Sequence, residues 1–139
     1  MEHGPRGGDE VNLIQKGANY GWPIISYGKE YWAPLAVGEG THKKGMLQAI
    51  KYYVPSIAPS SLIMYKGSVY KELKGKLLVG ALKLTHINIL SLDDKNNVIK
   101  EMRILEHLKQ RVRNIVESPN GLIYFSTDSG KILLLKPKY

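Results

Sequence analysis

The sequence of 139 residues contains no cysteine. Disulfide bonds, metal sites built from thiolates and a cysteine nucleophile are therefore excluded. The N-terminus has no basic segment followed by an apolar core, and no apolar run approaches the length that spans a membrane. Because the sequence as written carries neither an export signal nor a membrane segment, we expect a cytoplasmic location.

Motifs that would identify other classes of enzyme are also missing. There is no phosphate-binding loop, no glycine-rich dinucleotide fingerprint, no histidine pair at metal-binding spacing and no serine in a nucleophile elbow. No stretch carries a long helical pattern of apolar residues. The sequence therefore predicts an all-β fold.

Acidic residues are outnumbered, with 12 Asp and Glu against 20 Lys and Arg and a formal net charge of +8. A basic surface attracts phosphates, so this charge raises the question of nucleic-acid binding. Sixteen of the basic residues are lysines, and apart from Lys43-Lys44 they are scattered singly. No basic helix or nucleic-acid-binding motif is present. We interpret the charge as solvated lysines on strand faces and hairpin tips and expect no nucleic-acid partner.

Apolar runs interrupted by turn signals indicate where the strands lie. The length suits one domain, and 43% hydrophobic content is enough for a core. Residues 32–46 show no periodicity, so we expect a loop there. The dipeptide Asn120-Gly121, between two apolar runs, is the strongest short signal for a hairpin. The predicted strands are Ala49–Val54, Leu62–Tyr65, Lys76–Gly80, Thr85–Leu92, Val98–Leu105, Val112–Glu117, Leu122–Ser126 and Lys131–Lys136. Four of these strands lie between Leu62 and Leu105 and are joined by brief turns, and three more follow.

The first 23 residues concentrate glycine, proline and acidic residues around a short apolar run, Val11–Ile14. Gly4-Pro5 and Gly7-Gly8 force turns and expose backbone carbonyls, and Asp9-Glu10 follow directly. Calcium prefers carboxylate and carbonyl oxygens, which this stretch supplies without the spacing of an EF-hand. Two readings remain open: a calcium site, or a surface loop whose acids cap turns.

Several ordered motifs resemble one known family. They are Glu2-His3-Gly4-Pro5, Gly7-Gly8-Asp9-Glu10-Val11-Asn12, Asn19-Tyr20-Gly21-Trp22-Pro23, Ser56-Ile57-Ala58-Pro59-Ser60, Val79-Gly80-Ala81-Leu82-Lys83, Gln110-Arg111-Val112-Arg113 and Ser118-Pro119-Asn120-Gly121-Leu122-Ile123-Tyr124. In order and spacing they are similar to the soluble sugar dehydrogenases that use pyrroloquinoline quinone (PQQ). This is the glucose/sorbosone dehydrogenase family, and the aldose sugar dehydrogenase branch is the most similar.

The resemblance implies a fold. The family is a six-bladed β-propeller of much greater length, and its signature run lies past the middle. We therefore expect a partial β-propeller, roughly the last two to three blades. Residues 1–54 would form part of a blade and a long loop, 55–106 one four-stranded blade, and 107–139 three strands of the last blade.

The resemblance also implies ligands. Lys83, Arg111 and Arg113 would bind the carboxylates of PQQ, and Ser56 stands where relatives use a hydroxyl. Arginine forks suit carboxylates and planar rings, and two arginines spaced by one residue on a strand share a face. The carbonyls of Gly4 and Pro5 would bind the calcium ion that contacts the quinone. Glu10 and the carbonyl of Tyr20 would bind a second calcium.

The sequence departs from the family pattern after the arginines, and it also lacks the general base of the family. Asn114 replaces an aspartate that could orient the two arginines. The histidine that acts as general base in the family lies in its N-terminal half, so this chain has no catalytic residue. We expect no sugar oxidation from the chain alone.

The missing half suggests a partner. It would be an N-terminal-half polypeptide or a second copy of the chain, with a sugar as the substrate of the intact protein, which is usually exported to the periplasm. The alternative is a non-catalytic β-sheet interaction module, for example a homodimer that closes a propeller.

Overall fold

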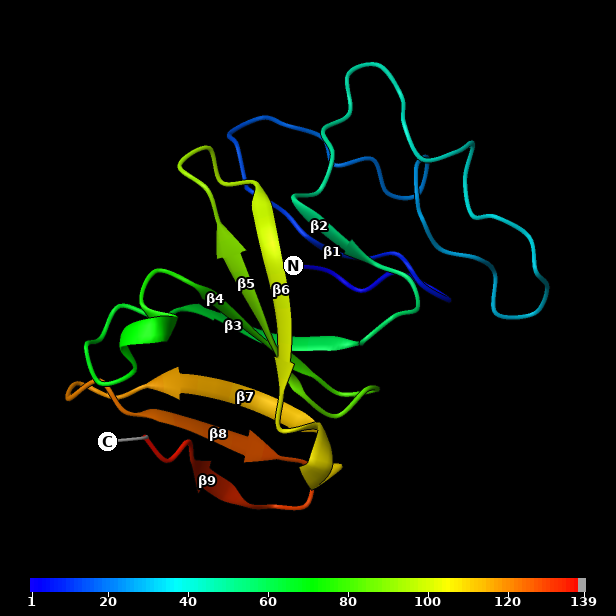
Figure 1. Cartoon of the computed structure of the whole chain (residues 1–139). Helices are drawn as coiled ribbons and strands as arrows, with labels where there is room; N and C mark the ends of the chain where they lie inside the picture. Colours follow the sequence, from blue (N-terminus) through cyan, green and yellow to red (C-terminus); the bar gives the residue numbers. More distant parts are fainter. Residues whose placement is uncertain (138–139) are drawn as a thin grey trace. The chain divides into compact units, whose positions relative to one another are not determined.

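A computed structural model describes residues 1–137 and confirms the all-β prediction. It contains three antiparallel sheets (Figure 1). Its helical segments are single 3₁₀ turns, η1 (Lys71–Leu73) and η2 (Glu106–Leu108). Within residues 1–137, no helix is long and apolar enough to cross a membrane. The chain divides into an N-terminal unit, Met1–Ala58, and a C-terminal unit that begins at Pro59.

The N-terminal unit consists mostly of loops held by one short ladder. Strand β1 (Asp9–Val11) pairs with β2 (Lys51–Tyr53). Both strands are shorter than the predicted apolar runs, because residues 12–14 leave the ladder. The loop predicted over residues 32–46 is confirmed, since that range contains only isolated bridges. Close backbone packing requires glycine at position 8, where a Cβ atom would lie 2.6 Å from the Gly28 nitrogen.

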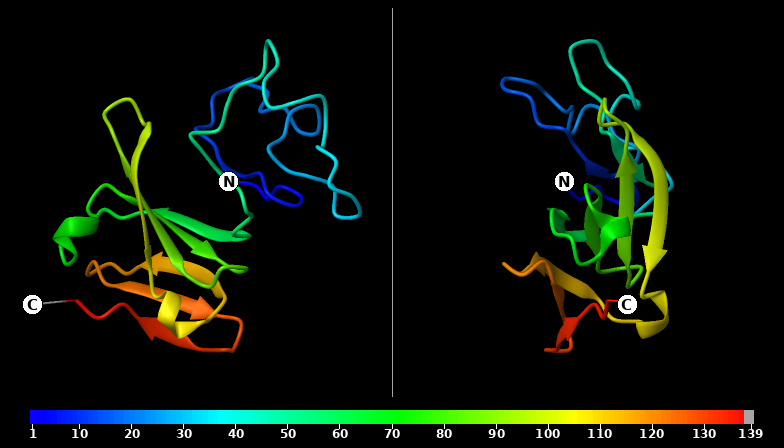
Figure 2. Two further views of the ribbon diagram at one scale, coloured as in Figure 1. Left: turned by 45° about the vertical axis from the view of Figure 1, so that its right-hand side comes forward. Right: turned by 60° about the vertical axis from the view of Figure 1, so that its left-hand side comes forward.

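The C-terminal unit begins with a four-stranded sheet in the order β3-β4-β5-β6. Each strand pairs with its neighbour in sequence, so the predicted set of four strands is confirmed. The strands are β3 (Pro59–Met64), β4 (Leu77–Ala81), β5 (Ile87–Leu92) and β6 (Val98–Ile104). A three-stranded sheet follows in the order β7-β8-β9, with β7 (Val112–Glu117), β8 (Ile123–Thr127) and β9 (Ile132–Leu134). The two views of Figure 2 follow the same strand order. The division of the chain into blades at residues 54 and 106 stays a prediction.

The core of the C-terminal unit joins its two sheets. Alternate residues of the four-stranded sheet, including Leu78 and Ile89, pack with Ile115 and Phe125 of the three-stranded sheet. Burying each such side chain contributes about 1.5–3 kcal/mol. The buried hydroxyl of Tyr65 donates a hydrogen bond to the Gly121 carbonyl at 2.8 Å. This bond anchors the Asn-Gly hairpin turn between β7 and β8 to the core.

Candidate functional site

Arg111 and Arg113 lie side by side on one carboxylate. The Asp128 oxygens accept hydrogen bonds from Arg111 Nε at 2.7 Å, from Arg113 Nε at 2.7 Å and from Arg113 Nη2 at 3.0 Å. Both arginines are about half exposed. The prediction that the two arginines share a face is therefore confirmed. The arginine-carboxylate cluster, defined as Arg111, Arg113 and Asp128, presents the remaining guanidinium donors toward solvent.

A strand bulge places these three side chains together. The register between β7 and β8 shifts between Val112 and Asn114, and the Asp128 amide donates to the Arg111 carbonyl at 3.1 Å. Hydrogen bonds from Arg113 and then from Arg111 hold the pKa of the Asp128 carboxyl below its usual value. The bond to Asp128 in turn raises the pKa of Arg113. Both charges of this pair therefore stay fixed over the physiological pH range.

Lys83 follows β4 in the same unit. A Cβ atom on Gly80 would meet Val112 Cγ1 at 3.0 Å, so β4 passes close to the start of β7. The Ser60 hydroxyl also donates to the Val112 carbonyl at 2.6 Å. Lys83, three residues beyond Gly80, is exposed. The end of β4 and the beginning of β7 are thus adjacent, and each carries exposed cations.

Ser56 lies in the N-terminal unit, where its hydroxyl donates to the Asp9 carboxylate. Asp9 is fully buried and also accepts from the Gly4 amide at 2.9 Å and the Ala58 amide at 2.8 Å. This carboxylate therefore ties the turn at Gly4 to the segment that contains Ser56 and Ala58. The main contact of Ser56 is structural, which the sequence did not indicate.

Glu10 has a different acidic neighbour from the one that the sequence suggested. Asp9 and Glu10 point to opposite sides of β1, and the backbone of Glu10 pairs with that of Glu2 through two hydrogen bonds of 2.9 Å. The Asn12 amide donates to Glu2 Oε1 at 3.2 Å and to Glu10 Oε2 at 3.3 Å. Burial, followed by the hydrogen bond and charge of Glu2, raises the pKa of Glu10 to about 7. The role of Glu10 as a metal ligand stays a prediction, and its acidic neighbour in the structure is Glu2.

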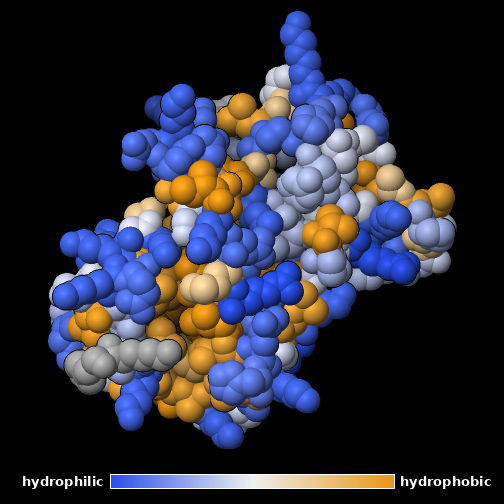
Figure 3. All heavy atoms as spheres, in the orientation of Figure 1, coloured by the Kyte–Doolittle hydropathy of each residue, from blue (hydrophilic) through white to orange (hydrophobic). Residues whose placement is uncertain are grey.

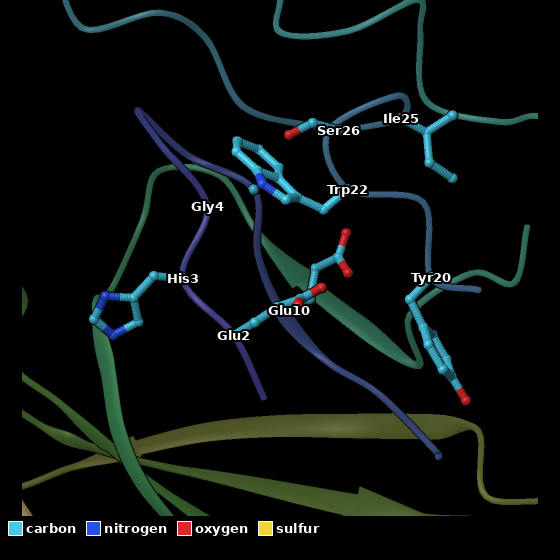
Figure 4. A pocket seen from close by; sticks show the side chains of 9 residues that line it. Glu2, His3, Gly4, Glu10, Tyr20, Trp22, Ile25 and Ser26 are labelled. Carbon is cyan, nitrogen blue, oxygen red and sulfur yellow. The ribbon is translucent and has the colours of Figure 1, made fainter. Parts of the chain in front are cut away.

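The acidic hollow is a small pocket between the Glu2 and Glu10 segments, with a volume of about 10 Å³. That volume holds roughly one water-sized particle. Its lining includes three predicted metal-site residues, Gly4, Glu10 and Tyr20, together with Glu2. Figure 4 shows the His3 ring and the Tyr20 ring pointing away from the two carboxylates. Pro5, the fourth predicted residue, is outside this lining, and its carbonyl accepts from the Tyr31 hydroxyl at 3.0 Å.

The donor set of the acidic hollow suits a hard cation. Two neighbouring carboxylates repel each other, and a divalent ion between them would relieve this repulsion. Asn12 Oδ1 is buried and has no hydrogen-bond donor among residues 1–137, which leaves a further oxygen for an ion. The same range contains no group of three or more His, Cys, Asp or Glu side chains placed to hold a metal. An ion here would therefore need backbone oxygens, as the family resemblance implies for the Tyr20 carbonyl beside Glu10.

Sequence reasoning missed Glu2 and Asp128. The signal for Asp128 was available, because the hairpin register counted from Asn120-Gly121 places residue 128 opposite Val112, between the two arginines. The bulge then shifts that register by one residue. The signal for Glu2 was weaker, because only an isolated bridge joins it to Glu10.

Comparison with known proteins supplies the family. The model of the family described as Glucose / Sorbosone dehydrogenase matches residues 1–136. The chain belongs to this family. Relatives include the protein slr1608 of Synechocystis sp., which is 42% identical over 135 residues, and the aldose sugar dehydrogenase YliI of Escherichia coli, which is 36% identical over 140 residues. The matches cover 97% and 99% of this chain but only 32% and 38% of those proteins.

Solved structures agree with this family assignment. A crystal structure of a glucose dehydrogenase superposes with a TM-score of 0.92 at 34% identity, and the apo-form of the E. coli soluble aldose sugar dehydrogenase with 0.91 at 35%. Each superposition covers 99% of this chain and 40% of the solved chain to which it is compared. This member of the glucose/sorbosone dehydrogenase family is thus a partial β-propeller that spans about two-fifths of its solved relatives.

Proposed function

We propose that this chain contributes the C-terminal part of a PQQ-dependent dehydrogenase that oxidises aldose sugars to lactones. The observation that carries the proposal is the arginine-carboxylate cluster. Its two guanidinium groups are about half exposed, and both are held by the carboxylate of Asp128. Guanidinium groups held in this way suit a planar ligand that carries several carboxylates. A quinoprotein glucose dehydrogenase of Acinetobacter calcoaceticus, 28% identical over 182 residues, supports the choice of a quinone.

Each residue has a separate task in this proposal. Arg111 and Arg113 bind quinone carboxylates, and Asp128 fixes their spacing. Arg111 commits only its Nε to Asp128 among the described contacts, so its terminal amino groups would be available to the ligand. Lys83 adds a third cation near the start of β7. Ser56 lies in the other unit and acts through Asp9, which holds the Gly4 segment in place.

The acidic hollow supplies the cation part of the proposal. Glu10, the Tyr20 carbonyl and the neighbouring Glu2 would hold a structural calcium, and the carbonyls of Gly4 and Pro5 would hold the calcium that contacts the quinone. Bound quinone and calcium would supply a hydride acceptor polarised by a Lewis acid. The chain's own residues bind and orient these groups.

Proton removal from the sugar is assigned to a residue outside this chain. His3 points away from the hollow in Figure 4, and His86 is buried with its Nδ1 3.0 Å from the Leu84 carbonyl. We therefore propose that the isolated chain binds ligands without oxidising sugar. General-base catalysis typically contributes about a hundredfold to ten-thousandfold in rate.

A thermal melt of the purified chain tests the proposal. Unfolding is followed by circular dichroism with calcium alone, PQQ alone and both together. A ligand at a hundred times its dissociation constant adds about 2.7 kcal/mol of stability, so binding gives a clear upward shift. Arg111→Gln should abolish the shift caused by PQQ, whereas Arg103→Gln, on the exposed face of β6, should retain it. A folded chain whose transition moves with neither ligand would show that the proposed sites do not bind.

A further inference from the structure

The Val112 carbonyl, at the start of β7, is bonded from outside its own sheet. Strand β7 lies at one edge of that sheet, and the Arg111 carbonyl accepts from the Asp128 amide on the side of β8. Successive carbonyls of a strand point to opposite sides, so the Val112 carbonyl points to the free edge. Val112 is only 2% exposed. A buried carbonyl at a free edge needs a hydrogen-bond donor from another part of the chain.

Ser60 of β3 supplies this donor, and a bulge brings it into position. Its hydroxyl donates to the Val112 carbonyl at 2.6 Å. The register between β3 and β4 shifts at this point, so that Ser60 and Ser61 both lie opposite Gly80. Their Oγ atoms are 2.6 and 3.3 Å from the place where a Gly80 Cβ atom would be. In a regular strand these two side chains would point to opposite faces, whereas a bulge re-aims one of them.

The two serine hydroxyls differ in their hydrogen bonding. The Ser61 Oγ atom is also buried, but it has no hydrogen-bond partner among residues 1–137. The surroundings are apolar, because Val112 belongs to the same hydrophobic core as Leu78 and Ile115. Figure 3, in the orientation of Figure 1, shows apolar surface over the region of the two sheets. Of these two neighbouring hydroxyls, that of Ser60 therefore links β3 to β7.

We infer that Ser60 is a positioning residue for the arginine-carboxylate cluster, because its hydroxyl fixes the backbone between Arg111 and Arg113. The inference rests on the proposed function, in which these two arginines bind quinone carboxylates. Val112 is the residue between them, and the side chains on either side of it share the opposite face of the strand. Holding the Val112 carbonyl therefore sets the direction in which both guanidinium groups leave β7.

The same bond fixes the cluster relative to Lys83. Gly80, which packs against Val112, lies three residues before this lysine. Without the Ser60 hydroxyl, the buried carbonyl loses its donor, which costs free energy unless the start of β7 moves toward water. Such a movement would change the separation between Lys83 and the arginines. It would weaken the binding of a ligand that needs all three cations.

Two matched serine variants test the inference. Ser60→Ala removes the linking hydroxyl, and Ser61→Ala removes the neighbouring buried hydroxyl that has no partner. The two variants therefore lose the same atom from adjacent positions. Two properties of the full chain are measured well below its melting temperature. They are the dissociation constant for PQQ in a buffer that contains calcium, and the rates at which the arginine Nε protons exchange with water, followed by NMR.

The exchange measurement needs no ligand. The Nε–H groups of Arg111 and Arg113 both donate to Asp128, so we expect both to exchange slowly in the unaltered chain. Ser60→Ala should speed their exchange and weaken PQQ binding, each by about two- to tenfold, which is the range that one hydrogen bond supports. Ser61→Ala should change neither property. The Nε proton of Arg103, in β6, is the internal reference and should exchange at the same rate in all three chains.

A folded Ser60→Ala chain with unchanged arginine exchange, or with unchanged affinity in a chain that binds PQQ, would overturn the inference. Ser60 would then have a structural role, which lowers the melting temperature alone. Equal effects of Ser61→Ala would overturn it too, because the bond to Val112 would not be their cause. If Ser60→Ala does not fold, Ser60→Cys, which has only a weak donor, takes its place with the same expected result. If the unaltered chain does not bind PQQ, the proposed function fails, and the arginine exchange rates still decide this inference.

Discussion

The carboxylate of Asp128 accepts two hydrogen bonds from the guanidinium group of Arg113, at 2.7 Å from Nε and 3.0 Å from Nη2. The same carboxylate also accepts from Arg111. An acid therefore orients both arginines even though residue 114, where the resemblance predicted an aspartate, is asparagine. The acid is supplied by the turn that follows β8 instead of by the arginine motif.

This relationship predicts an acid titration. The pKa of Asp128 is held below its ordinary value by Arg113 first and Arg111 second, so Arg113→Gln should raise that pKa toward the value of a free carboxyl. Carboxyl-carbon NMR across pH 2 to 6 measures the change, with Arg103→Gln as the control. A depressed carboxyl pKa adds stability above the unfolded-state pKa, and this is lost as pH falls through the folded-state pKa. An unchanged midpoint in Arg113→Gln would show that the bidentate bond does not persist in solution.

The hydrogen bond from the Ser56 hydroxyl to the Asp9 carboxylate predicts that the two side chains are energetically coupled. Ser56→Ala removes one donor from a buried carboxylate that keeps two backbone donors, and should destabilise the chain by about 1–3 kcal/mol. Asp9→Asn should cost at least as much, and the double variant should cost less than the two single variants added together. Denaturant unfolding measures all three. Strict additivity would mean that the serine hydroxyl does not depend on Asp9 and is available to a ligand.

Strand positions could be predicted from the sequence because they depend on local signals. The apolar run at residues 112–117 and the Asn-Gly turn after it define β7 and its hairpin directly. In the N-terminal unit the same reasoning overestimated the strands, since Leu13 and Ile14 continue the apolar run but lie outside β1 in the structure. Strand length there is decided by the partner, which the run itself does not reveal.

The side-chain partners could not be predicted in the same way. Asp128 reaches the arginines through a bulge, and Glu2 reaches Glu10 through a single isolated bridge. Both depend on register over several residues, where an error of one position turns a side chain to the other face. The types of the candidate ligand residues were therefore predictable, but the residues that hold them were not.

The raised pKa of Glu10 predicts that the free energy of unfolding falls as pH rises. Its folded-state pKa of about 7 is above the ordinary value of 4.5, so between these pH values the folded state binds more protons than the unfolded state. The free energy of unfolding therefore decreases as pH rises through this window. Glu10→Gln should flatten this decrease, whereas Glu72→Gln, at an exposed site in η1, should leave it unchanged. Melting temperatures from pH 4 to 8 measure the effect, and a slope that survives in Glu10→Gln would contradict it.

The lowered pKa of the buried His86 side chain predicts that the free energy of unfolding rises with pH. The ring is fully buried, its Nε2 has no hydrogen-bond partner among residues 1–137, and burial lowers its pKa below 6.5. As pH falls below 6.5, the unfolded state takes up a proton that the folded state does not, so stability is lost. His86→Phe should remove this acid-side loss, whereas His107→Gln, at an exposed position in η2, should keep it. Because the two slopes have opposite signs and partly cancel in the unaltered chain, each single variant separates them: stability should rise with pH between 5 and 6.5 in Glu10→Gln, and it should fall with pH in His86→Phe.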